Sequence, residues 1–223
     1  MFARLTLAAL LFAAVPAQAQ TAEDEQLWVN LTVMKTEANG IAWFAEVQSR
    51  VGNGLTDVQQ LLLRPAVGYK LSDALTVYLG YAHVVLPRAD GDRNEERGFA
   101  QATWTIGKVG RGTLSSRSRL EARTLSNERD VGWRGREMLR FVHPITSPEK
   151  VRALVSAEVF VALNTTDWGA RRGFDQLRSF AGVEVPIGGK NTLELGYLNQ
   201  WIDDPGRASR VNHVAAISAF FRL

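Results

Sequence analysis

Residues 151–164 read VRALVSAEVFVALN, and this stretch indicates the fold class of the chain. Its apolar residues recur at every second position, and long polar side chains stand between them. One face carries Val151, Ala153, Val155, Ala157, Val159, Val161 and Leu163, and the other includes Arg152, Ser156, Glu158 and Asn164. Because successive side chains of an extended strand point to opposite sides of a sheet, this period of two predicts a β-strand with one apolar face.

The same period recurs in residues 41–51 and 59–71, so the pattern belongs to most of the chain. A soluble sandwich and a membrane barrel share it, but candidate strands of about 10–14 residues exceed the five or six of most globular strands and suit a membrane crossing. Long charged side chains also crowd the polar faces, which suits the wet lumen of an outer-membrane barrel. We therefore predict an all-β, antiparallel transmembrane β-barrel.

Eleven segments qualify as strands, whereas bacterial single-chain barrels have an even number. We predict ten strands, with twelve as the alternative, and treat residues 27–38 as a surplus segment that lines the lumen or the periplasmic mouth. Short turns near residues 72–74, 109–111 and 188–190 are expected in the periplasm, and longer polar loops outside. The candidates are residues 27–38, 41–51, 59–71, 75–86, 95–108, 114–125, 133–143, 151–164, 173–187, 192–202 and 211–223.

The first nineteen residues resemble an export signal. Arg4 supplies a positive charge, an apolar run follows from Leu5 to Val15, and Ala17-Gln18-Ala19 provides the small residues of a cleavage site. We predict a signal peptide over residues 1–19, cleaved near Ala19, and a barrel domain over residues 20–223. The expected location is the outer membrane of a Gram-negative bacterium.

Aromatic and glycine positions agree with a membrane barrel. Trp133 and Trp201 fall at the proposed external strand ends, while Trp43, Trp104, Tyr69 and Phe221 fall near the periplasmic ends, as the aromatic girdles of a barrel require. An apolar-Gly-Tyr unit recurs at residues 67–69, 79–81 and 195–197. In each unit we expect the glycine to face inward and leave room for long neighbouring side chains.

Composition excludes several function classes. The 223 residues contain no cysteine, so disulfides, thiolate metal sites and cysteine nucleophiles are absent, and a net charge of +3 is too small to indicate a nucleic-acid partner. The three histidines, His83, His143 and His213, are far apart in sequence and show no metal-ligand spacing. We expect no cofactor, no metal and no enzyme activity. The second alternative is a lipid-modifying hydrolase with a Ser–His pair on the barrel wall, which would use the serines that lie among the arginines of residues 115–118.

Inward charge is the strongest candidate site. The predicted lumen charge network comprises Arg50, Arg64, Glu95, Arg97, Arg117, Arg119, Glu121, Arg123, Arg134, Arg136, Glu158 and Glu184. A narrow barrel must fill its interior, and Arg–carboxylate pairs do so with satisfied hydrogen bonds, so we interpret the network as a salt-bridged plug. The alternative is a small anion-preferring channel or binding barrel, because inward arginines outnumber inward glutamates. Glu95 is expected to supply negative charge to the arginines of residues 117–123.

Short motifs resemble a family of predicted outer-membrane proteins labelled domain of unknown function 2490. They are Leu27-Trp28, Glu95-Glu96-Arg97 with Gln101, the run from Arg117 to Arg123, Arg134-Gly-Arg136 and Gly196-Tyr197-Leu198. The resemblance implies an outer-membrane β-barrel and no defined activity. The partners expected for such a protein are outer-membrane lipid and the barrel assembly machinery, with a small anion as a further candidate. Barrels generally end in an aromatic residue, whereas this chain ends in Leu223.

Overall fold

The computed structural model describes residues 21–145, 150–204 and 208–223, all as strands and their connections. The predicted signal peptide over residues 1–19 lies outside these described residues. Within them, no helix is long and apolar enough to cross a membrane. The strands are β1 (Ala22–Thr36), β2 (Ile41–Gly52), β3 (Asp57–Lys70), β4 (Leu75–Leu86), β5 (Arg93–Val109), β6 (Gly112–Leu125), β7 (Gly132–Pro144), β8 (Arg152–Ala162), β9 (Gly173–Pro186), β10 (Thr192–Ile202) and β11 (Arg210–Arg222).

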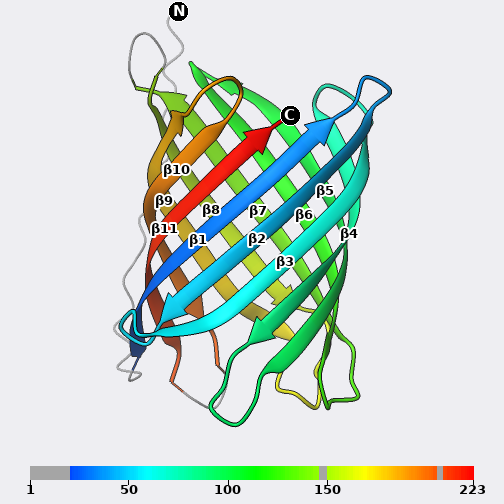
Figure 1. The fold of residues 1–223 in the computed structure, drawn as a ribbon, viewed down its shortest axis with the longest axis vertical. Coiled ribbons are helices and arrows are strands. Elements are labelled where there is room, and N and C mark those ends of the chain that lie inside the picture. Colours follow the sequence, from blue (N-terminus) through cyan, green and yellow to red (C-terminus); the bar gives the residue numbers. More distant parts are fainter. Residues whose placement is uncertain (1–20, 146–149, 205–207) are drawn as a thin grey trace, which may run out of the picture.

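These eleven strands form one closed barrel (Figure 1). Each strand pairs antiparallel with its neighbours in the chain, and β1 closes the ring by pairing in parallel with β11, from Ala22 beside Arg210 to Met34 beside Arg222. The prediction of ten strands, with twelve as the alternative, was therefore wrong. The even-number rule holds for closure by an antiparallel pair, whereas a parallel closing pair permits an odd number.

The parallel seam also corrects the role predicted for residues 27–38. This segment is neither surplus nor inside the lumen, because most of it belongs to β1 and forms part of the wall. It alternates as the other strands do: Trp28 and Thr32 are buried, whereas Val29 and Leu31 are exposed. Its apolar outer face is what a wall strand needs.

Alternating burial separates an inner and an outer face in every strand. In β8, Val155 and Val159 are exposed on the outside, whereas Leu154, Glu158 and Phe160 are buried inside the barrel. The parity predicted from residues 151–164 is thus confirmed. Glu158 is buried although it is charged, so the barrel holds charged side chains in its interior.

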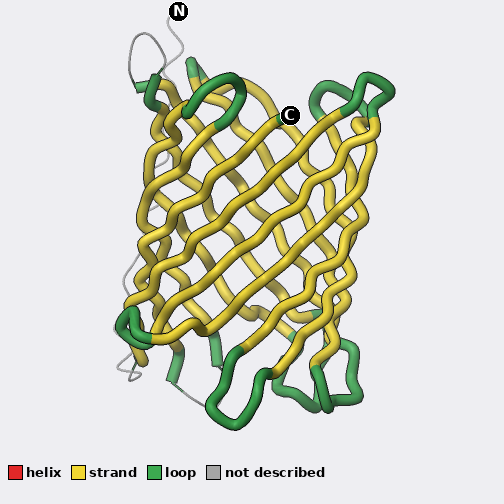
Figure 2. The backbone as a smooth tube through the Cα atoms, in the orientation of Figure 1, coloured by secondary structure: helices red, strands yellow, loops and turns green. Residues whose placement is uncertain are grey.

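The strands form a continuous wall, and loops lie only at its two ends (Figure 2). One end, here the short-turn end, carries residues 37–40, 71–74, 110–111 and 187–191 together with Leu223. The opposite end, the long-loop end, carries residues 87–92, 126–131 and 163–172 as well as the shorter 53–56. The short-turn end is the upper end in Figure 1, beside the C-terminus.

Glycines in the repeated apolar-Gly-Tyr units make room for inward rings, as predicted. A Cβ on Gly80 would lie 2.2 Å from the Phe99 ring, and one on Gly196 would lie 2.6 Å from the Phe180 ring. The following tyrosines, Tyr81 and Tyr197, are exposed on the outer face. The repeat therefore reflects packing in a narrow barrel.

Candidate functional site

Glu121 is the centre of the charge in the lumen. It projects inward from β6 and is 1% exposed. Its Oε2 accepts hydrogen bonds from Nε and Nη2 of Arg134 at 2.9 and 2.6 Å, and its Oε1 accepts one from Nη1 of Arg136 at 2.7 Å. Nη1 of Arg119 lies 3.5 Å from Oε1. Both oxygens are thus satisfied by arginines of the same strand and the next one, an arrangement that offsets the desolvation of a buried carboxylate.

Arg136 extends this pairing along the barrel. Its Nε and Nη2 donate to Glu158 Oε1 at 3.1 and 2.8 Å, so one guanidinium bridges the carboxylates of Glu121 and Glu158. Arg117 donates to the same oxygen of Glu158 at 2.9 Å. The planar guanidinium suits this role because it offers donors on several edges at fixed angles.

Glu95 holds a second group on the neighbouring strand. Its carboxylate accepts from Arg97 at 2.7 Å and from Arg123 at 2.5 Å. The expectation that Glu95 supplies negative charge to the arginines of β6 is met at Arg123. We call the residues of these two groups the Arg–Glu lattice. They are Glu95, Arg97, Arg117, Glu121, Arg123, Arg134, Arg136 and Glu158.

The Phe160 ring packs against the lattice and is fully buried. The guanidinium carbons of Arg136, Arg178 and Arg134 lie 4.4, 4.5 and 5.2 Å from its centroid. Desolvated arginines gain from such contacts with an aromatic face. Together the ring and the ion pairs fill the lumen beside β5 to β8 near the long-loop end.

A smaller ion-pair group lies toward the short-turn end. Arg140 contacts Glu184 at 2.7 Å and Glu194 at 2.5 Å, and Arg152 contacts Glu184 at 2.7 Å. Separately, Arg64 donates to Glu46 at 2.7 Å. Among the described residues, no ion pair links these groups to the Arg–Glu lattice.

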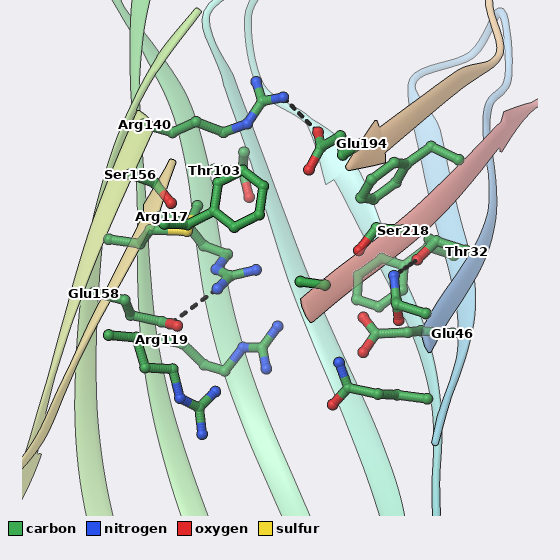
Figure 3. A pocket seen from close by; sticks show the side chains of 18 of the residues that line it. Thr32, Glu46, Thr103, Arg117, Arg119, Arg140, Ser156, Glu158, Glu194 and Ser218 are labelled. Atoms are coloured by element: carbon green, nitrogen blue, oxygen red, sulfur yellow. Dashed lines mark hydrogen bonds and ion pairs between the residues drawn. The ribbon is translucent and has the colours of Figure 1, made fainter. Parts of the chain in front are cut away.

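Between these pairs the lumen contains a cavity of about 460 Å³. Figure 3 shows Arg117, Arg119 and Glu158 on one wall, and Thr32, Glu46 and Ser218 on the facing wall. The cavity reaches Arg222 near the short-turn end and Arg50, two residues before the end of β2, whereas Glu121, Arg123 and Arg134 do not line it. Part of the lumen is therefore packed with ion pairs, and part of it is open.

All twelve residues of the predicted charge network face the lumen, but they do not form one continuous network. Eight of them make up the two groups of the Arg–Glu lattice, one around Glu95 and one around Glu121 and Glu158, whereas Arg64 and Glu184 belong to separate pairs. Arg119 approaches Glu121 only loosely and donates mainly to Gln101. Arg50 donates to Gln48 and contacts no carboxylate within the described part of the chain.

Sequence reasoning missed the aromatic and amide partners of these arginines. Phe160 and Trp28 stand at inward positions, but a ring there looks no different from ordinary core packing. Gln101 was noted only as part of a family motif. An alternating pattern identifies the inner face and does not say which inward groups meet, because that depends on strand register.

The serines considered for a hydrolase contact a carboxylate or a backbone carbonyl, and none contacts a histidine among the described residues. Ser116 and Ser118 both donate to Glu137, on the outer face of β7, the second at 2.5 Å. His83 pairs instead with Glu96 at 2.8 Å, and His213 with Tyr197 at 2.6 Å. Among the described residues, no group of three or more metal-ligating side chains could hold a metal ion.

Known proteins match this chain in sequence and in fold. A family described as protein of unknown function (DUF2490) matches residues 25–212. An uncharacterised protein of Methylorubrum extorquens is 45% identical over 223 residues, which cover 98% of this chain and 97% of that protein. The solved structure of the NanC porin is similar in fold, with a TM-score of 0.50 and 13% identity, over 81% of this chain and 87% of that one. The family match spans most of the barrel, and the chain therefore belongs to the DUF2490 family of proteins of unknown function.

Proposed function

We propose that the protein is an integral outer-membrane β-barrel whose lumen is closed by the Arg–Glu lattice. The observation that carries the proposal is the outer face of the wall, where large apolar side chains are exposed on almost every strand. Val47, Leu63, Val67, Leu79, Leu120, Leu139 and Val155 are each at least 44% exposed. Soluble monomers rarely expose contiguous apolar patches larger than a few hundred Å². Lipid is the partner that such a surface requires.

Strand length and aromatic placement support the same proposal. The strands run for 11–17 residues, enough for the tilted crossing of about 9–11 residues that a membrane needs. Trp133 and Trp201 lie exposed near the long-loop end, and Tyr69 and Trp104 lie exposed nearer the short-turn end. Amphipathic rings at two levels are typical of the two membrane interfaces. In this proposal the short-turn end faces the periplasm, as in other barrels.

The lattice supports a closed lumen over an open pore. Glu121 and Arg134 are buried, and Phe160 fills the space beside them. A resting barrel packed in this way would have no continuous water path from end to end. The similarity to a porin extends to the fold, and we propose a closed barrel because of the packing seen here.

A small anion-selective channel is the second candidate. It is favoured by the lining of the cavity, where eight arginines face three glutamates. A channel would require the ion pairs of Glu121 to open, since they lie between the cavity and the long-loop end. Conductance measurements separate the two candidates.

Fractionation and gel mobility test the membrane location. The protein should partition with outer-membrane vesicles and resist extraction by carbonate. It should also migrate differently in a detergent gel with and without boiling, because folded barrels keep their compact shape in cold detergent. Recovery in the soluble periplasmic fraction, with the same mobility before and after boiling, would contradict the proposal.

A further inference from the structure

The cavity has a larger excess of arginine over glutamate than the Arg–Glu lattice, which contains five arginines and three glutamates. Of the residues that line the cavity, eight are arginines and three are glutamates. Glu46, Glu158 and Glu194 are each already in contact with an arginine. Several guanidiniums therefore line the cavity with no carboxylate to themselves.

Arg50 and Arg178 are the clearest of these. Neither contacts a carboxylate within 4 Å among the described residues; Arg50 donates only to Gln48, and the buried Nε of Arg178 has no hydrogen-bond partner. Arg119, whose side chain is 2% exposed, has an Nη1 without a hydrogen-bond partner, 3.5 Å from Glu121. A buried donor left unpaired costs free energy, so these groups offer hydrogen bonds that an anion would complete.

An aromatic ring holds two of these cations together. The guanidinium carbons of Arg50 and Arg178 lie 3.8 and 5.0 Å from the centroid of Trp28. Trp28 is itself buried and fixed by a hydrogen bond from its Nε1 to Gln26 at 2.7 Å. The two cations are thus held near each other before any ligand arrives, which lowers the entropy lost on binding.

The same cavity has an apolar part. Phe44, Tyr78, Leu154, Phe180, Leu198 and Phe220 line it together with the arginines. Phe44 and Tyr78 pack edge to face with their centroids 5.2 Å apart, so part of this apolar surface is preformed. A volume of about 460 Å³ lies in the range of small-molecule sites, which are mostly apolar with a few convergent polar groups.

We propose that this cavity binds a small organic acid. Its carboxylate accepts hydrogen bonds from Arg50 and Arg178, and its apolar body lies against Phe180 and Leu198, which pack beside Trp28. The planar guanidinium matches a carboxylate with two parallel hydrogen bonds. Thr103 on the cavity wall is exposed to solvent, so a ligand has access from outside. That this access is from the periplasm rests on the proposed function; binding itself does not.

Calorimetry with benzoate tests this inference on the purified full-length protein in detergent. Benzoate should bind, while acetate, which lacks the apolar body, and benzyl alcohol, which lacks the charge, should bind at least tenfold more weakly. Inorganic phosphate should also bind at least tenfold more weakly. Phosphate binding as tight as that of benzoate would overturn the ligand class, and no heat of binding with benzoate would overturn the site.

Variants locate the site. The double variant Arg50→Gln with Arg178→Gln should lower benzoate affinity at least tenfold. Arg50→Gln alone, which breaks no ion pair, should lower benzoate affinity at least threefold. This single variant replaces the double variant as the test if the double variant does not fold. Arg93→Gln is the matched control, because Arg93 pairs with Glu128 outside the cavity and its loss should leave affinity unchanged. Affinity unchanged in folded Arg50→Gln would contradict the inference. The membrane fraction in which the protein is found bears on the proposed function alone.

Discussion

On β5, β6 and β7, Glu121 and Glu95 each hold at least two arginines with the help of neighbouring strands, whereas Arg50 of β2 and Arg178 of β9, which line the cavity, contact no carboxylate among the described residues. The residue type is the same, but its surroundings differ. Where carboxylates interleave, arginine fills space and cross-links strands. Where they are missing, arginine is left with donors facing a cavity. This difference indicates that the paired arginines stabilise the barrel and that the unpaired arginines are available for a ligand.

The largest expected effect of a single change is at the centre of the lattice. Glu121→Ala leaves Arg134, Arg136 and Arg119 without their shared carboxylate, and breaking such a buried group typically costs about 3–5 kcal/mol. Urea unfolding in detergent should show this loss. Arg123→Ala should cost less, since Glu95 keeps Arg97. Equal stability of Glu121→Ala and the wild type would show that the lattice does not stabilise the fold.

A pair of substitutions on β8 tests whether the two faces of the wall differ as proposed. Val155→Arg places a charge on the lipid face near the middle of the strand, where an arginine costs about 2–4 kcal/mol at the bilayer midplane. Ser156→Arg points into the cavity, which has room for it, and should avoid this cost. Folding into lipid vesicles measures both. If Val155→Arg inserts as well as Ser156→Arg, the outer face is not in lipid.

The same substitution at a paired and at an unpaired arginine compares the two environments directly. Arg136→Gln removes hydrogen bonds to both Glu121 and Glu158 and should cost about 1.5–3 kcal/mol, the range for bonds to charged groups. Arg50→Gln removes no ion pair, only hydrogen bonds to Gln48 and the contact with Trp28, and should cost less than Arg136→Gln. Both are read from unfolding midpoints. Similar losses in the two variants would remove the distinction between lattice and cavity.

Packing around the inward rings gives a smaller effect. Gly80→Ala drives a methyl group into the Phe99 ring, and overpacking of this kind typically costs about 1–3 kcal/mol. Gly98→Ala is the control, because a Cβ there meets no atom within 4 Å. The thermal unfolding midpoint should fall for Gly80→Ala only. A matching fall in both variants would point to a backbone effect of losing glycine.

Much of this architecture follows from alternation alone. The parity of residues 151–164 places Glu158 inside and Val155 outside, and the charge run of β6 places Glu121 in the lumen. Strand count was less accessible, because β1 alternates like any wall strand and nothing in its residues shows that its partner, β11, runs parallel to it.

The pairing of individual charges was also beyond the sequence. Arg136 meets both Glu121 and Glu158 because of the register of β6, β7 and β8, which side-chain periodicity does not fix. The cavity depends on register too, since it forms where Arg50 and Arg178 share the Trp28 ring in place of a carboxylate. Alternation predicted an excess of arginine inside the barrel, and only the fold shows which of these arginines lack a carboxylate.

Conductance of the purified protein in a planar lipid bilayer tests most directly whether the lattice closes the lumen. The account predicts that the inserted wild-type protein gives no discrete current steps, because the ion pairs of Glu121 and the buried Phe160 close the path beyond the cavity. Heat-modifiable mobility of the protein recovered from the same vesicles establishes that it is folded. Reproducible, anion-selective steps from the folded wild-type protein would contradict the account and make the arginine-lined lumen a channel.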